Sequence, residues 1–227
     1  MIEVFDNAEQ LAWAAAEYFV AQNPETVALS GGTTPQQMFK ILADNFREEL
    51  PWSDIKFFWS DERHVPPNHP ESNYRMAQET LLSRVPVAQN NVHRIRGENA
   101  NAADAASDYE QTLVTVTRED LPRLDLTFLG LGDDGHTASI FPASEVLHES
   151  KRLVAAPYVD KLKTYRITMT PPLINNSSAV VFLVSGAEKA QIVKEVLESE
   201  NNYPAQIVRP TQGELIWMLD KDAAQNL

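Results

Sequence analysis

The chain has 227 residues, no cysteine and a formal net charge of −13 at neutral pH. This length allows one large α/β domain or two small ones, and the missing cysteines exclude disulfide bonds and thiolate chemistry. The acidic balance argues against nucleic acid as a partner. The chain starts without the basic segment of a signal peptide, and its longest apolar run, Ala179–Val184, is far too short to span a bilayer. We therefore expect a cytoplasmic protein with no membrane partner.

The first elements alternate between helix and buried strand. Apolar residues recur at helical spacing over residues 6–22, which predicts an amphipathic helix. A short apolar strand over residues 27–30 follows. It leads into a helix that continues to Phe46, for which Thr34 fits the N-cap and Pro35 the first helical position.

The junction between that strand and helix is a candidate anion site. It reads Ser30-Gly31-Gly32-Thr33, and the free N–H groups and dipole at a helix N-terminus attract negative charge. The hydroxyls of Ser30, Thr33 and Thr34 add hydrogen-bond donors. The pattern is neither a Walker loop nor a dinucleotide fingerprint. A tight turn without a ligand is therefore the alternative.

A second charged segment follows the predicted strand over residues 55–59. It reads Ser60-Asp61-Glu62-Arg63-His64 and is either part of a site or the solvated start of a loop. The proline-rich loop over residues 64–75 is a candidate binding loop or lid. Ser72-Asn73 then caps a short helix.

The stretch Leu124–Pro142 is the most informative part of the chain. After a short predicted strand at 92–95 and a helix over 99–116, residues 124–131 form an apolar run without strict alternation, which suits a strand buried on both faces of a parallel sheet. A glycine-rich turn with Asp133, Asp134 and His136 comes directly after it. Ligands bind at this end of strands in open α/β sheets, and a histidine there can act as a base. The alternative is a turn whose aspartate caps the next helix and whose histidine is merely exposed.

The last third repeats the strand–turn–helix pattern. Residues 144–150 are expected to be irregular, and strands are predicted over 166–170, 179–184, 206–208 and 214–219. Lys189 falls in the first turn of the helix after residue 184, where the helix dipole disfavours a cation unless an anion binds nearby. Because strands and helices alternate throughout, we predict one α/β domain over residues 1–227. It should be Rossmann-like, with a mostly parallel sheet and helices on both faces.

Six motifs in this order resemble the 6-phosphogluconolactonases of the glucosamine-6-phosphate isomerase/6-phosphogluconolactonase superfamily. They are Leu29–Pro35, Trp59–Pro66, Ser72–Tyr74, Gly130–Pro142, Arg166–Thr170 and Ser185–Ala190.

The resemblance implies hydrolysis of 6-phosphogluconolactone, a sugar phosphate lactone, in the oxidative pentose phosphate pathway. It also implies no metal or organic cofactor, and we favour a monomer. It makes His136 the general base, with Asp134 in its turn, and Arg63 a cationic group of the lactonase branch. It associates substrate or phosphate with Ser30, Gly31, Gly32, Thr33, Asn73, Arg166 and Lys189.

The deaminase branch of the superfamily is the main alternative. Asp61 matches its isomerase base, which leaves the role of Asp61 in a lactonase open. That branch carries Asp-Glu-Tyr where this chain has Asp61-Glu62-Arg63, and an Asn-Glu pair after its histidine, where this chain has no acid. A non-catalytic sugar-phosphate sensor and a nucleotide-binding oxidoreductase are further possibilities. The second lacks a dinucleotide fingerprint. Gly-x-Ser-x-Gly is absent, which disfavours a covalent serine route.

Overall fold

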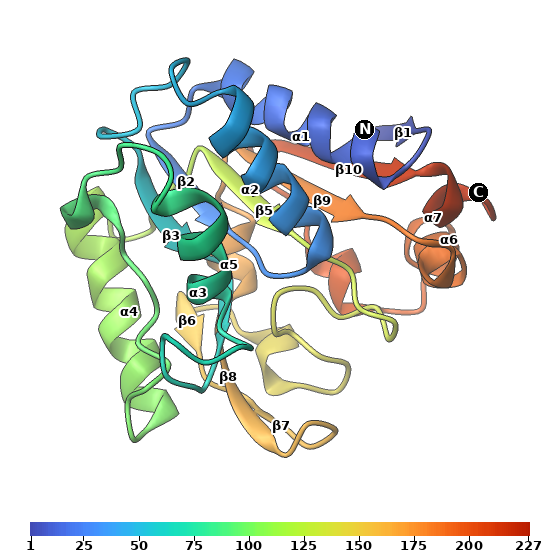
Figure 1. Ribbon diagram of the computed structural model, residues 1–227. Coiled ribbons are helices and arrows are strands. Elements are labelled where there is room, and N and C mark those ends of the chain that lie inside the picture. The colour runs from blue at the N-terminus through green and yellow to red at the C-terminus, as the bar shows by residue number, and fades with distance from the viewer.

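The computed structural model describes residues 1–227 and is built around a sheet of six parallel strands (Figure 1). The strands follow the spatial order β1-β10-β9-β5-β2-β3, and every neighbouring pair is parallel. Their carboxyl ends therefore lie along one edge of the sheet. The bounds are β1 (Ile2–Phe5), β10 (Glu214–Asp220), β9 (Ala179–Val184), β5 (Leu126–Leu129), β2 (Thr26–Leu29) and β3 (Lys56–Trp59).

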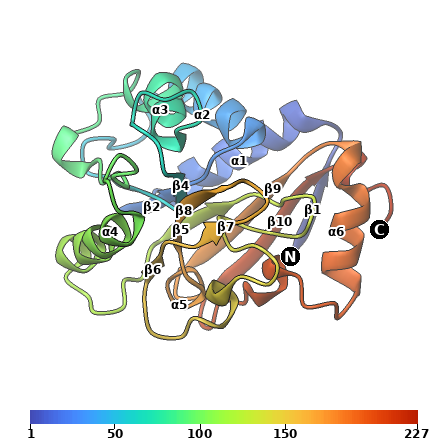
Figure 2. The same cartoon turned by 90° about the horizontal axis from the view of Figure 1, so that it is seen from below.

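Helices cover both faces of this sheet, as the sequence predicted (Figures 1 and 2). Phe19 of α1 stacks on Phe128 of β5, with ring centroids 6.2 Å apart. Thr127, the preceding residue of β5, shares a 2.9 Å hydrogen bond with Ser177, which follows α5. Successive strand residues point to opposite faces, so α1 and α5 lie on opposite sides of the sheet. The helices are α1 (Ala8–Gln22), α2 (Thr33–Asn45), α3 (Asn73–Ala77), α4 (Ala102–Thr117), α5 (Pro171–Ile174), α6 (Ala190–Glu198) and α7 (Lys221–Ala224).

The inner strands are buried on both faces because their side chains are apolar without alternation. All six residues of β9 and all four of β5 are buried. The outermost strand β1, by contrast, alternates between exposed and partly buried residues. Buried side chains from the strands and the covering helices join in one cluster of 56 residues.

A smaller antiparallel sheet stands beside the parallel one. It contains β4 (Asp61–Arg63), β8 (Thr164–Met169) and β6 (Val154–Ala155), and β7 (Tyr158–Val159) forms a hairpin with the start of β8. Only β8 was predicted from the sequence, as residues 166–170. The charged segment after β3 is therefore not a loop start, because Asp61–Arg63 pairs with β8 and is fixed in position.

Two predicted strands are wrong. Residues 206–208 lie mostly in a 3-10 helix, η5 (Pro204–Ile207), because Pro204 starts a helical turn there. Residues 92–95 form only an isolated bridge between Val92 and Phe57. Four further short helical segments connect the elements, namely η1 (Gln78–Leu82), η2 (Gln89–Asn91), η3 (Glu145–His148) and η4 (Ala187–Lys189). Of these, η3 replaces the irregular segment expected over residues 144–150.

The helix that follows β2 begins earlier than predicted. Gly32 occupies the N-cap position, with φ 109°, and Thr33 is the first helical residue. Thr34 is therefore the second helical residue and not the cap. Its hydroxyl forms a hydrogen bond with Ser185 in the cavity described below. The Ser72 cap of α3 is confirmed, since its side chain accepts a hydrogen bond from the Arg75 N–H.

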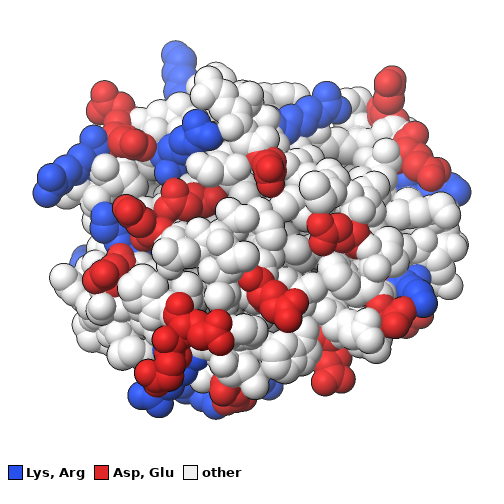
Figure 3. Space-filling view, turned by 90° about the horizontal axis from the view of Figure 1, so that it is seen from above, with Lys and Arg blue, Asp and Glu red and all other residues white.

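The surface reflects the acidic composition. On the face shown in Figure 3, acidic side chains are scattered among uncharged residues, and basic side chains lie mainly towards the edges. This face has no continuous basic stripe of the kind that follows a nucleic-acid backbone. No helix of the chain has both the length and the apolar composition to cross a membrane.

Candidate active site

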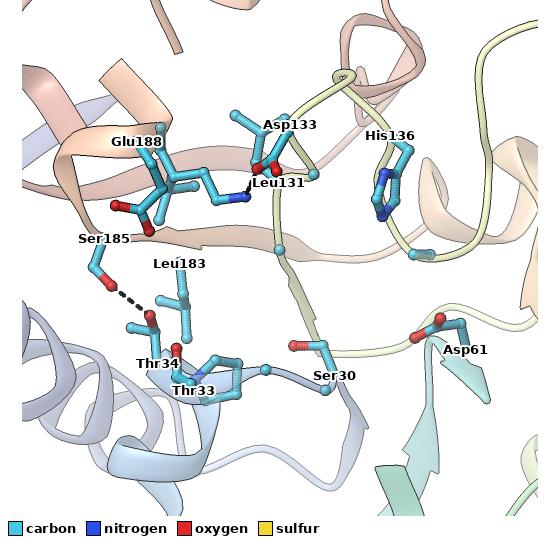
Figure 4. A pocket seen from close by; sticks show the side chains of 18 of the residues that line it. Ser30, Thr33, Thr34, Asp61, Leu131, Asp133, His136, Leu183, Ser185 and Glu188 are labelled. Atoms are coloured by element: carbon cyan, nitrogen blue, oxygen red, sulfur yellow. Dashed lines mark hydrogen bonds and ion pairs between the residues drawn. The ribbon is translucent and has the colours of Figure 1, made fainter. Parts of the chain in front are cut away.

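A cavity of about 370 Å³ opens at the carboxyl ends of three adjacent strands, β2, β5 and β9 (Figure 4). The turn after each strand contributes a part of the wall, and β4 adds two charged residues from the side. Because these strands are neighbours in the sheet, turns that are far apart in sequence meet here. The polar residues of the wall include Ser30, Thr33, Thr34, Asp61, Arg63, Asp133, His136, Lys161, Ser185, Glu188 and Lys189.

One end of the cavity is suited to an anion. The N-terminus of α2 faces it, and the first N–H groups of a helix have no intrahelical partner. The buried hydroxyl of Ser30 has no hydrogen-bond partner either. Lys189, from the turn after β9, lines the same cavity and donates to Asp133. This end therefore combines unused donors with a cation held by an exposed carboxylate.

A hydroxyl pair joins the two turns of the anion end. The oxygens of Thr34 and Ser185 lie 2.8 Å apart, and Figure 4 shows this bond beside Glu188. The turn after β9 is fixed from behind by Asp220, whose buried carboxylate accepts the Gly186 N–H at 3.1 Å and caps α7. These hydrogen bonds fix the two turns that form the anion end.

His136 faces the other end of the cavity (Figure 4). Its Nδ1 lies 2.6 Å from the Asp134 carboxylate, and its ring stacks on Phe141 with centroids 4.2 Å apart. The second Asp134 oxygen accepts a hydrogen bond from the Lys161 ammonium at 3.2 Å. The imidazole is therefore held by a carboxylate at its edge and by a ring on its face.

The charge of Asp134 determines which imidazole nitrogen is free. Partial burial alone would raise the pKa of Asp134. Hydrogen bonds from His136 and Lys161, together with the charge of the protonated His136 ring, outweigh it and lower this pKa to about 2. An ionised carboxylate only accepts hydrogen bonds, so Nδ1 of His136 must carry the proton that it shares with Asp134. In the neutral imidazole, Nε2 then has the lone pair, which can take a proton from water.

Asp61 is buried at the cavity wall and is fully hydrogen-bonded. One of its oxygens accepts from Ser139 at 2.6 Å and the other from the Asn73 amide at 3.1 Å. Asn73 is itself buried and does not line the cavity, because its amide is used to hold Asp61. The structure therefore gives this predicted binding residue a supporting position.

Glu62 fixes the start of α3 and with it Asn73. Its carboxylate accepts the N–H groups of Asn73 and Tyr74 and the hydroxyl of Ser72, at 2.8 to 2.9 Å. Burial raises the pKa of Glu62, although these hydrogen bonds oppose the shift. The end of the candidate lid over residues 64–75 is thus anchored; its motion remains a prediction.

Arg63 and Arg166 lie side by side in the small sheet, where they form a directly opposed pair of β4 and β8. Arg63 lines the cavity and donates to the carbonyl of Glu71 at 2.8 Å. Arg166 does not line the cavity, and burial, followed by the neighbouring charge of Arg63, lowers its pKa. Direct substrate contact by Arg166 therefore remains a prediction. Arg209 donates to the carbonyl of Gln206 and lies outside the cavity wall.

Sequence reasoning missed several residues of the site. Ser185 could have been found, since it precedes a glycine after a buried strand just as Ser30 does. Ser139 and Phe141 lie within the Gly130–Pro142 motif, but their contacts with Asp61 and His136 are tertiary. Lys161 carries no comparable signal, because it acts through a tertiary contact with Asp134.

Sequence comparison supplies the family. The chain belongs to the glucosamine-6-phosphate isomerases/6-phosphogluconolactonase family, whose sequence profile matches residues 4–217. The 6-phosphogluconolactonase of Synechocystis sp. is 44% identical over 208 residues, which are 89% of this chain and 84% of that protein. The 6-phosphogluconolactonase of Haemophilus influenzae is 35% identical, and the match covers 96% of this chain and 94% of its own.

Solved structures agree with this family assignment. The structure of 6-phosphogluconolactonase from Trypanosoma brucei superposes with a TM-score of 0.90 at 30% sequence identity, over 100% of this chain and 98% of that one. The predicted α/β class and the family resemblance are therefore confirmed.

Proposed function

We propose that this chain hydrolyses 6-phosphogluconolactone to 6-phosphogluconate, as its named relatives do. One observation carries the proposal. The imidazole of His136, with Nε2 free, lines the same cavity as the α2 N-terminus and Lys189. This arrangement offers a base at one end and an anion site at the other, as hydrolysis of a phosphorylated lactone requires.

The substrate phosphate binds at the anion end. It accepts hydrogen bonds from the first N–H groups of α2 and from the free hydroxyl of Ser30, with Gly31, Gly32 and Thr33 forming the turn beneath it. It also takes the place of Asp133 as the partner of Lys189. An exchange of one exposed carboxylate for a phosphate dianion preserves the ion pair and adds charge.

Water attack then proceeds at the His136 end. Nε2 removes a proton from a water molecule as the water oxygen bonds to the lactone carbonyl carbon. The carbonyl oxygen becomes an oxyanion, which Arg63 or a backbone N–H stabilises. When the tetrahedral intermediate collapses, the bond from the carbonyl carbon to the ring oxygen breaks. The imidazolium returns its proton to that oxygen. Asp61, fixed by Ser139 and Asn73, orients Arg63 or the water.

The deaminase alternative fits the site less well. That reaction needs a second acid/base near the ring oxygen in addition to a carboxylate base. The residues after His136 offer no acid, and Ser139 among them is already hydrogen-bonded to Asp61. The support of the histidine comes from Asp134 instead. The buried Asp61 is the observation that keeps the alternative open.

Two assays separate these activities and the sensor alternative. Freshly made 6-phosphogluconolactone is added to the protein, and acid release is followed in a pH-stat above the spontaneous rate. Glucosamine-6-phosphate is then tested for ammonia release. The proposal expects acid release without ammonia. Ammonia release would assign the chain to the deaminase branch, and binding of the lactone without turnover would make it a sensor.

We also propose that residues 1–227 act as one domain, as a monomer and in the cytoplasm. The single cluster of 56 buried residues supports the first part. Sedimentation equilibrium at micromolar concentration tests the monomer, and a second unfolding transition would contradict the single domain.

A further inference from the structure

Lys161 lines the cavity, but the proposed mechanism assigns it no role. Three cations line the wall, and each has a different partner. Lys189 pairs with Asp133 at the anion end, and Arg63 donates to a backbone carbonyl. Lys161 instead donates to Asp134, the residue that holds His136.

The position of Lys161 is set by a tight turn between β7 and β8. The Leu162 N–H donates to the carbonyl of Val159 at 3.0 Å, and Lys163 follows with φ 54°. The hairpin continues into β8, which pairs with β4, the strand that carries Asp61 and Arg63. The ammonium therefore reaches the cavity from the small sheet, whereas His136 comes from the parallel one.

Asp134 depends on Lys161 for its orientation. One carboxylate oxygen accepts a hydrogen bond from Nδ1 of His136 at 2.6 Å, and the other accepts one from the Lys161 ammonium at 3.2 Å. The imidazole has further support from Phe141, whereas the second oxygen of Asp134 has no other side-chain donor. Without Lys161 the carboxylate is held through one oxygen only, by Nδ1 and by the backbone N–H of His136 at 3.3 Å, and its second oxygen no longer fixes its rotation.

We propose that Lys161 is a positioning residue, which holds Asp134 against His136 so that Nε2 faces the water. The inference rests on the proposed hydrolase function for its kinetic consequence. A residue of the β7–β8 hairpin in the small sheet thereby supports the proposed base, His136, which follows β5 of the parallel sheet. Lys161 touches neither the lactone nor the phosphate, and it acts through Asp134 alone.

Lys161 also has an electrostatic effect on the pair. Its positive charge opposes a proton on His136, and its removal leaves the negative charge of Asp134 uncompensated. The acid limb of the kcat/KM profile should therefore move to higher pH when the ammonium is lost. The other charged groups that share the cavity with His136 are Asp61, Arg63, Asp133, Glu188 and Lys189.

The test compares Lys161→Met with Lys161→Arg and with Lys163→Met, a control in the same turn that does not line the cavity. We expect Lys161→Met to lower kcat about 10- to 100-fold, the scale on which a misplaced catalytic group costs rate, with little change in KM. Its acid limb should shift to higher pH. Lys161→Arg should restore most of kcat, and Lys163→Met should match the wild type.

Three kinetic outcomes would overturn the inference. A rise in KM alone would make Lys161 a phosphate ligand. Equal losses in Lys161→Met and Lys163→Met would give the hairpin a merely structural role. An unshifted pH profile with unchanged kcat in Lys161→Met would show that Lys161 does not position Asp134 and His136.

A second readout does not depend on activity. In ¹⁵N spectra of the histidine rings, with His136 assigned by comparison with His136→Gln, the wild type should show a proton fixed on Nδ1. Lys161→Met should show a mixture of tautomers, and identical spectra would overturn the inference. If the wild type fails to hydrolyse the lactone, the proposed function falls while these spectra still decide the role of Lys161.

Discussion

Gly132 lies beneath the imidazole of His136, where a side chain has no room. A Cβ atom at this position would come within 2.0 Å of Cε1 and Nδ1 of the ring, well inside van der Waals contact. The glycine also donates its N–H to the carbonyl of His136 at 2.8 Å. The turn therefore closes tightly on the ring that it presents.

Gly132→Ala should displace the imidazole and lower kcat. We expect a loss of about 10²-fold, because a shift of about 1 Å in a catalytic group costs that much. Gly130→Ala is the matched control, since nothing lies within 4 Å of a Cβ atom there. Steady-state hydrolysis of the lactone measures both variants. Equal rates in Gly132→Ala and the wild type would show that the ring tolerates displacement.

At the residue scale, the sequence predicted the groups that are close in the chain. Asp134 and His136 belong to one turn, so their contact follows from local geometry. The contacts of Phe141 and Lys161 with this pair depend on how a loop and a hairpin fold back, which no local pattern encodes. The contacts that support His136 were therefore less predictable than His136 itself.

The anion end is formed by two turns that are far apart in the sequence. The turns after β2 and β9 flank β5 in the sheet, and the Thr34–Ser185 hydrogen bond spans the space between them. Lys189 then points from the second turn across the cavity to Asp133 after β5. Three strand ends thus cooperate in one small site.

Lys189→Ala should mainly raise KM for the lactone. A charge-assisted hydrogen bond contributes about 1.5–3 kcal/mol, so we expect KM to rise about 10- to 100-fold with kcat nearly unchanged. Lys194→Ala is the control, because Lys194 belongs to the same region but pairs with Glu198 outside the cavity. Initial rates over a range of lactone concentrations measure both constants. A fall in kcat at constant KM would place the phosphate elsewhere.

At the element scale, long apolar strands were predictable and short paired ones were not. The strand Ala179–Val184 has the predicted bounds because its six residues are all apolar. By contrast, β4 has three residues, two of them acidic, and β6 and β7 have two residues each. These strands exist because β8 offers them a pairing edge. Apart from β8 itself, the small sheet that brings Arg63 and Lys161 to the cavity therefore had no sequence signal.

The stability of the whole molecule depends on pH through the ionisation of Asp134. The folded state holds the pKa of Asp134 at about 2, below its ordinary value of 3.8. As the pH falls, the unfolded chain therefore takes up this proton before the folded one does. The stability contributed by Asp134 is fully present above pH 4 and is lost as the pH falls towards 2.

Asp134→Asn should consequently flatten the acid side of the stability profile. We expect the difference in Tm between pH 5 and pH 3 to be smaller in this variant than in the wild type, as measured by calorimetry on a grid of about half a pH unit. Asp160→Asn serves as the control, because this exposed carboxylate has no side-chain hydrogen bond. Some acid sensitivity should persist, since Glu149 also has a pKa of about 2. An unchanged profile would show that Asp134 is not ion-paired in solution.

The proposed mechanism depends on one imidazole, that of His136 at the tip of β5, which removes the proton from water. Steady-state hydrolysis of fresh 6-phosphogluconolactone by His136→Ala tests it most directly, with the spontaneous rate subtracted and the fold checked by circular dichroism. We expect kcat to fall by about 10²-fold or more, the scale of general base catalysis. A kcat close to that of the wild type would contradict it.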